Sequence, residues 1–148
     1  MTIKSLKLRN ELRELETMRL FLEESARTFC FDERLLYRLN LICDELVTNI
    51  ISYGYDENAE VASRIEIILS HTPECLEISI TDDGAAFNPL NKQEPDLNAG
   101  IDERKIGGLG IHFVKTLTNK AVYERQGKRN ILRLTINRHQ EPEEEQTG

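Results

Sequence analysis

Between Gly54 and Arg64 the spacing of apolar residues changes from a helical period to a strand period, and this change constrains the fold more than any other feature. Between Asp32 and Gly54 the apolar residues recur at steps of three and four, which predicts an amphipathic helix with Asp32 as its N-cap. From Arg64 onward they alternate with polar residues, which predicts a hairpin around Thr72 to Glu74. The helix and the hairpin each have one apolar face, so each must pack against the other.

Weaker patterns predict the other elements. Residues 3–9 alternate as in a strand, and residues 11–29 repeat at helical steps beginning with Leu12. The predicted elements after the hairpin are a long loop at 88–106, a short helix at 111–117, and strands at 122–125 and 132–136 around Gln126-Gly127-Lys128. This order predicts an α+β fold, a two-layer α/β sandwich whose mixed, mostly antiparallel sheet has its helices on one face. We expect one domain over residues 1–139 and a disordered acidic tail over 140–148.

Length and charge exclude several classes of protein. The chain has 148 residues, enough for one hydrophobic core, and a net charge of −7. Without the four glutamates of the tail the body carries only −3, so we expect neither a nucleic-acid partner nor a membrane partner. No apolar run approaches the ~20 residues that span a bilayer, and no signal peptide precedes the domain, which predicts a soluble cytoplasmic protein.

The three cysteines do not form a pattern typical of metal binding or of disulfides. Cys30, Cys43 and Cys75 include no C-x-x-C pair, and their number is odd. Cys43 is surrounded by apolar residues in the sequence. We therefore expect buried free thiols.

A first candidate site lies on the predicted helix that ends at Gly54. Glu45 and Asn49 are one helical turn apart, so both side chains project from the same edge of the helix. A carboxylate and an amide oxygen side by side suit magnesium, which prefers oxygen ligands. A solvated helix face would show the same spacing.

A second candidate site follows the strand that ends at Thr81. The segment Asp82-Asp83-Gly84 places a carboxylate at a strand end, where it can form the floor of a pocket, and glycine allows a flat ligand to approach the backbone. An ordinary acidic turn has the same composition.

A third candidate site is the glycine cluster at residues 107–110. Four of the eight glycines lie between positions 100 and 110, and the cluster directly precedes the predicted helix at 111–117. Backbone N–H groups at such a helix start can bind phosphate oxygens. The cluster has neither the lysine of a Walker A motif nor the spacing of a Rossmann fingerprint, and a mobile hinge is the alternative. A long loop such as 88–106 in a small domain is usually a lid or a binding loop.

These three clusters, E-x-x-x-N, D-x-G and G-G-x-G in this order, resemble the N, G1 and G2 boxes of the GHKL ATPases. Within this class the sequence most resembles the bacterial anti-sigma factor serine/threonine kinases, and the resemblance covers roughly residues 5–137. The resemblance implies the histidine kinase-like ATPase domain, also known as the Bergerat ATP-binding fold.

The resemblance also implies a role for each residue of the clusters. Asn49 would ligate the Mg²⁺ that bridges the phosphates of ATP, and Glu45 would be the general base. Asp82 would hydrogen-bond the adenine amino group, and Gly84 would let the purine lie close. Residues 90–106 would be the ATP lid. The phosphates would lie against Gly107, Gly108, Leu109 and Gly110, with Lys105 as a candidate contact.

The function implied by the resemblance is phosphorylation of a serine on an antagonist protein of the STAS type, by a homodimer that also sequesters a sigma factor. The alternative is a nucleotide-gated protein-binding module that transfers no phosphate. The catalytic part of a sensor histidine kinase is a weaker candidate, because none of the three histidines lies on a long predicted helix.

The chain departs from the family pattern at three places. Tyr53 replaces a frequent histidine, and Ala86 replaces the second glycine of the G1 box. The threonine that many relatives place beside adenine on the penultimate strand is replaced around Asn130 and Ile131.

Overall fold

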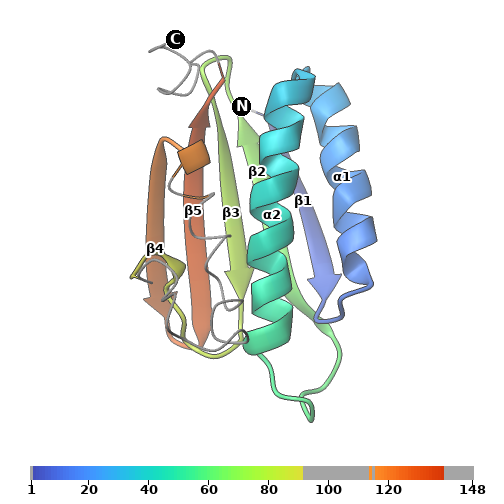
Figure 1. Cartoon of the computed structure of the whole chain (residues 1–148), viewed down its shortest axis with the longest axis vertical. Helices are drawn as coiled ribbons and strands as arrows, with labels where there is room; N and C mark the ends of the chain where they lie inside the picture. Colours follow the sequence, from blue (N-terminus) through green and yellow to red (C-terminus); the bar gives the residue numbers. More distant parts are fainter. Residues whose placement is uncertain (1, 92–113, 115, 139–148) are drawn as a thin grey trace, which may run out of the picture.

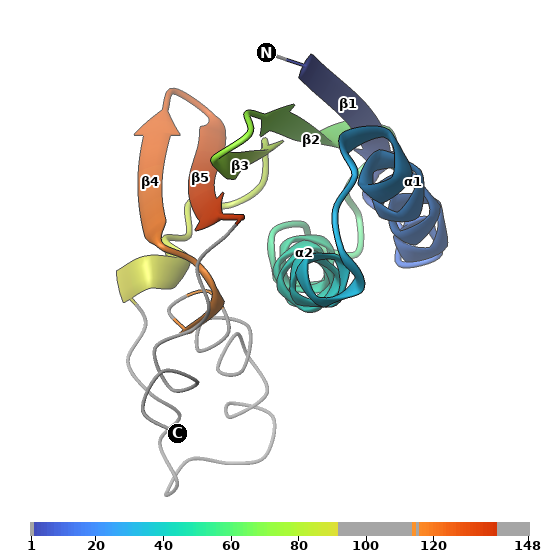
Figure 2. The same cartoon turned by 90° about the horizontal axis from the view of Figure 1, so that it is seen from above.

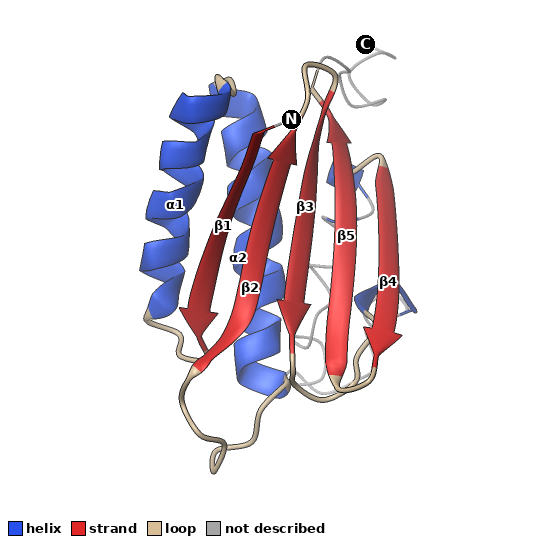
Figure 3. Ribbon diagram, turned by 180° about the vertical axis from the view of Figure 1, so that it is seen from behind, coloured by secondary structure: helices blue, strands red, loops and turns tan. Residues whose placement is uncertain are grey.

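The computed structural model describes residues 2–91, 114 and 116–138, which form two helices packed on one face of a five-stranded sheet (Figures 1 and 3). The predicted acidic tail, and most of the predicted lid and of the helix at 111–117, lie outside the described residues. The elements in chain order are β1 (Thr2–Arg9), α1 (Glu14–Phe29), α2 (Glu33–Tyr53), β2 (Ser63–His71), β3 (Cys75–Asp82), the 3-10 turn η1 (Pro89–Asn91), β4 (Lys120–Gln126) and β5 (Arg129–Asn137).

The sheet has the order β1-β2-β3-β5-β4, and all four pairings between its described strands are antiparallel. The predicted α+β class, with two layers and helices on one face, is confirmed. We expected a mixed, mostly antiparallel sheet, whereas the pairings between the described strands are all antiparallel. Viewed from above, α2 lies over the middle of the sheet and α1 lies beyond it toward β1 (Figure 2).

Helix α2 begins and ends where the sequence predicts. The Asp32 carboxylate accepts a hydrogen bond from the Leu35 N–H at 2.8 Å, which is a side-chain N-cap. At the other end the Gly54 N–H donates to the Ile50 carbonyl, and the helix stops at Tyr53. The period of its apolar residues therefore gave both its position and its length.

Helix α1 begins later than the periodicity suggests. It starts at Glu14, so the prediction that it begins at residue 11 with Leu12 was wrong, and Leu12 is 53% exposed. The carboxylate of Glu14 accepts from the Arg9 N–H, and the Asn10 side chain bonds to the backbone of the loop before β2. These contacts hold the preceding residues in a turn, so the apolar spacing at Leu12 is coincidental.

The core lies between α2, α1 and the covered face of the sheet. Strands β2, β3 and β5 each contribute alternate apolar residues, as their period of two predicts. Leu39, Ile42 and Val47 of α2 are completely buried against them. The fully buried strand residues are Leu8, Ile65, Ile67, Leu69, Leu76, Ile78, Ile80, Leu134 and Ile136.

Both predicted hairpins are present. Thr72 closes the turn between β2 and β3, where its hydroxyl accepts from the Glu74 and Cys75 N–H groups. Gly127 turns the β4–β5 hairpin with a φ of 59°, a conformation that glycine adopts at no steric cost.

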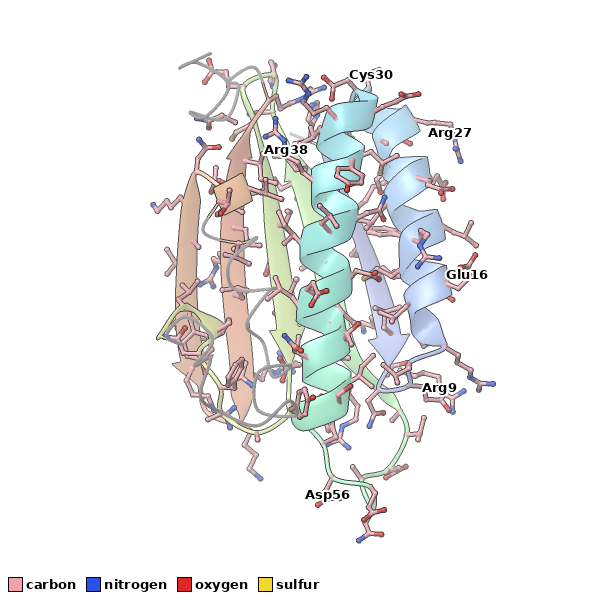
Figure 4. All side chains as sticks on the ribbon, viewed as in Figure 1. Arg9, Glu16, Arg27, Cys30, Arg38 and Asp56 are labelled. Atoms are coloured by element: carbon pink, nitrogen blue, oxygen red, sulfur yellow. The ribbon has the colours of Figure 1, made fainter. Side chains whose placement is uncertain are left out.

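The cysteines differ in environment, which corrects the expectation that all three are buried. Cys43 is fully buried, and burial together with the charge of Asp44 raises its pKa to about 12. Cys75 is half-buried, whereas Cys30 is exposed at the junction of α1 and α2 (Figure 4). All three are free thiols.

A helix that crosses a membrane must be long and apolar. None of the described helices is long and apolar enough to cross a membrane.

Arg138 ties the end of β5 to the end of α1. Its guanidinium donates to the Phe29 and Cys30 carbonyls at 3.2 and 2.8 Å, and it also contacts the His71 ring. That ring stacks on Phe29 with centroids 4.9 Å apart. Burial lowers the pKa of His71, and the positive charge of Arg138 lowers it further.

This depressed pKa makes stability depend on pH. The folded protein releases the His71 proton more readily than the unfolded chain, whose pKa is near 6.5. The resulting stabilisation is full above pH 6.5 and is lost as the pH falls through the folded pKa. In urea unfolding between pH 8 and 5.5, we expect the wild-type free energy of unfolding to fall more steeply than that of His71→Gln. Parallel pH profiles would contradict this assignment.

Candidate functional site

A cavity of about 180 Å³ opens beside the C-terminal half of α2, against the ends of β3, β4 and β5. Its walls are largely apolar, and its polar side chains include Asn49, Asp82 and Asn130. The lining residues are Leu46, Asn49, Ile50, Tyr53, Gly54, Ile80, Asp82, Ala85, Ala86, Phe87, Pro89, Tyr123, Asn130 and Leu132. A concave apolar site with a few convergent polar groups is the usual form of a small-molecule pocket.

Among the described residues that line the cavity, Asp82 is the one with a charged side chain. It continues the buried row of β3 that passes through Ile78 and Ile80, so its side chain points to the covered face and is only 5% exposed. Its Oδ1 accepts from the Gly84 N–H at 2.8 Å and from Asn130 Nδ2 at 3.0 Å. Burial raises the pKa of the Asp82 carboxyl, and these two hydrogen bonds partly offset that effect.

The second oxygen of Asp82 is open to the cavity. No described group bonds to Oδ2. Every fully buried side-chain nitrogen or oxygen among the described residues has a hydrogen-bond partner, so Oδ2, which has none there, is not fully buried. Oδ2 is therefore exposed within the pocket that Asp82 lines. It can accept one hydrogen bond from a ligand.

Asn130 faces Asp82 across the β3–β5 pairing and connects four segments of the chain. Its Nδ2 donates both to Asp82 and to the Ala85 carbonyl, the latter at 2.9 Å. Its Oδ1 accepts from the Phe87 N–H at 3.3 Å, from the Tyr123 hydroxyl, and from the Arg125 guanidinium at 3.1 Å. The amide thus holds the loop after β3 against the β4–β5 hairpin.

Asp83 points away from Asp82 into a second network. Its carboxylate accepts from the Tyr55 hydroxyl at 2.6 Å and from Arg64 Nε at 3.0 Å, and the Arg64 guanidinium lies 4.7 Å from the Tyr55 ring centroid. Burial alone would raise the pKa of Asp83, but these hydrogen bonds and the Arg64 charge lower it below its usual value. The network ties the segment after α2 to the end of β3.

Gly84 makes a close approach to the end of α2. A Cβ built on Gly84 would lie 2.7 Å from the Gly54 carbonyl oxygen and 3.1 Å from Asp82 Oδ1, and the adjacent Ala85 N–H donates to that same carbonyl. Gly84 itself is not among the lining residues. Its lack of a side chain is therefore needed for packing, and its contact with a purine stays a prediction.

Helix α2 carries both residues of the first predicted cluster. Asn49 lines the cavity with Asp82, so the structure brings these two predicted residues together. Glu45, one turn earlier on α2, is half-buried and is not part of the lining. The predicted contacts Lys105, Gly107, Gly108, Leu109 and Gly110 lie outside the described residues.

Tyr123, Arg125 and the Asn130 amide were not predicted as site residues. The alternation of β5 contained a signal for Asn130, because it lies two residues before Leu132 and so shares the covered face. Nothing in the sequence pairs it with Asp82.

Residues 8–136 match the model of the histidine kinase-like ATPase domain. The chain therefore belongs to this family, and the Asp82 pocket lies in its ATPase domain. This agrees with the GHKL resemblance of the three clusters.

One protein and two solved structures are similar to this chain over most of its length. The chain is 30% identical over 123 residues to the serine/threonine-protein kinase BtrW of Bordetella bronchiseptica, covering 83% of this chain and 84% of that protein. It superposes on the structure of the RsbU and RsbW domains of Rv1364c from Mycobacterium tuberculosis with a TM-score of 0.66, at 16% identity. That match covers 93% of this chain but a third (33%) of the longer chain. The catalytic domain of the histidine kinase ThkA matches with a TM-score of 0.50, at 18% identity over 93% of this chain and 98% of that one.

The described residues fit an adenine nucleotide with its metal. The apolar walls suit a flat ring, and the open Asp82 Oδ2 suits an amino group on that ring. Asn49 offers an amide oxygen of the kind that Mg²⁺ accepts as a ligand.

The close approach at Gly84 predicts a cost for any added side chain. Gly84→Ala would force apart backbone segments that cannot move independently, and overpacking of this kind costs about 1–3 kcal/mol. We expect a lower melting temperature by calorimetry. Gly127→Asn is the control, because a Cβ at Gly127 meets nothing within 4 Å and asparagine tolerates a positive φ. Equal melting temperatures of the two variants would refute the packing role.

Proposed function

We propose that this protein is an ATP- and Mg²⁺-dependent serine kinase that phosphorylates an anti-sigma factor antagonist of the STAS type. The observation that carries the proposal is the Asp82 carboxylate, held by two hydrogen bonds on one oxygen and open to an apolar cavity on the other. Asn49 lines the same cavity from α2, where it would hold the metal. Likeness to BtrW, a serine/threonine-protein kinase, supports the reaction class.

In this proposal Asp82 selects the base and α2 supplies the catalytic groups. Magnesium neutralises phosphate charge when it is bound, and Asn49 would be its protein ligand. Glu45 would accept the proton of the acceptor serine as the serine oxygen bonds to the γ-phosphorus and ADP leaves with the electron pair of the broken bond. Glycines 107, 108 and 110, with Leu109 and Lys105, would contact the phosphates as the family resemblance implies.

The proposed partners come from the resemblance of the three sequence clusters to those of the anti-sigma factor kinases. The proposed substrate is a STAS-type antagonist, and the kinase would sequester a sigma factor or an equivalent regulator as a homodimer. The solved relative that contains RsbU and RsbW domains supports a regulatory setting.

The second candidate function is a nucleotide-gated binding module without phosphate transfer. It is favoured by the absence of Glu45 from the cavity lining in the described part of the chain, since nucleotide binding alone does not need this carboxylate. Transfer assays separate the two functions.

Glu45 is expected to matter for transfer and not for binding. General-base catalysis contributes about a hundredfold or more, so Glu45→Gln should lower transfer from labelled ATP to a STAS-domain protein of the same organism by at least that factor. Its calorimetric affinity for ATP should stay close to that of the wild type. The control Glu57→Gln, an exposed loop residue, should transfer normally. Normal transfer by Glu45→Gln would exclude Glu45 as the base, and ATP binding without transfer by the wild type would favour the binding module.

Asn49 is expected to matter for the metal-dependent part of ATP affinity. Replacing the amide in Asn49→Ala removes one oxygen ligand, so the gain in affinity on adding Mg²⁺ should shrink by about tenfold. Affinity measured in EDTA should change little. Titrations of ATP with and without Mg²⁺, with the exposed Asn58→Ala as control, measure this difference. The same Mg²⁺ gain in Asn49→Ala and wild type would remove Asn49 from the metal site.

A further inference from the structure

We propose that Asn130 is the positioning residue that makes Asp82 selective for an amino group on the bound base, although Asn130, itself in the cavity lining, has no N–H left to donate to the ligand. This inference rests on the proposed nucleotide site and extends it to the origin of base specificity.

The orientation of the Asn130 amide is determined by its partners. The Phe87 N–H and the Arg125 guanidinium can only donate, so the atom that they contact must be the oxygen. The Ala85 carbonyl can only accept, so the atom beside it must be the nitrogen. A flipped amide would set donors against donors, and Nδ2 therefore always faces Asp82.

The same partners use the full hydrogen-bonding capacity of the amide. Both Nδ2 hydrogens are donated, to Asp82 and to Ala85, and Oδ1 already accepts from three donors. No donor remains for a ligand. Asn130 therefore acts on the base only through Asp82.

The consequence for Asp82 is a fixed division between its two oxygens. Oδ1 is held by the Gly84 N–H and by Asn130, which also prevents rotation of the carboxylate, while Oδ2 faces the cavity without a partner among the described residues. A lone acceptor at this place favours a base whose edge presents an N–H donor. A base with hydrogen at the same ring position makes no bond there.

The test compares ATP with purine riboside triphosphate, which has hydrogen in place of the amino group. A hydrogen bond to a charged group changes affinity by about tenfold to a hundredfold, so the wild type should prefer ATP by at least tenfold. Asn130→Asp and Asn130→Ala should reduce that preference to about threefold or less. Their affinity for purine riboside triphosphate should stay within about threefold of the wild type, which also reports that they are folded.

Two control variants separate positioning from general damage. Leu132→Val, two residues along β5 and also in the cavity lining, should change both affinities by the same factor and keep the preference. Asn58→Asp, at an exposed loop position, adds the charge of Asn130→Asp away from the pocket and should keep both affinities. A preference retained in the Asn130 variants would overturn the assignment of Asn130 while leaving ATP binding intact.

A measurement on the wild type does not depend on the folding of any variant. The two Asn130 side-chain N–H protons should exchange slowly with water by NMR, both without nucleotide and with ATP. Rapid exchange in the two states would overturn the inference. A wild type that binds neither nucleotide would overturn the proposed function, and with it the role given to Asn130.

Discussion

The hydrogen bond between Asp82 and Asn130 is the interaction on which the site depends. It places a carboxylate at the end of an otherwise apolar sheet face, where an unpaired charge would be costly. Asn130 and the Gly84 N–H satisfy one oxygen, and the cavity leaves the other available. The charge is thus tolerated in the core and is still able to meet a ligand. Buried hydrogen-bond networks of this kind fix the orientation of the side chains that form them.

The architecture brings α2 to this carboxylate through backbone contacts. Gly54, at the end of α2, meets Gly84 closely enough that no side chain fits at Gly84. The Asp83, Tyr55 and Arg64 network supports the same junction from the solvent side. As a result, the helix face that carries Asn49 forms one wall of the cavity that contains Asp82. The family match places this arrangement in a histidine kinase-like ATPase domain.

Much of the fold could be predicted because its signals are local. The period of α2, its Asp32 cap and the alternation of the hairpins depend on neighbouring residues, and the structure bears them out. Leu12 failed as a helix residue because contacts of Asn10 with the distant segment at Glu60 and Ala62 hold this turn. Asp82 was predicted from its place at a strand end. The network of Asn130 was not, because its partners lie far apart in the sequence.

The sequence by itself determined the class of fold, the apolar faces, and the three clusters that resemble the boxes of the family, since these depend on residue type and spacing. Tertiary structure alone decided which oxygen of Asp82 lacks a partner among the described residues, that Gly84 packs against Gly54, and that Asn130 bonds to the carboxylate. The physical reason is that a pairing register aligns residues from separate strands, and hydrogen-bond geometry then selects individual atoms. Spacing along one chain carries no information about such atoms.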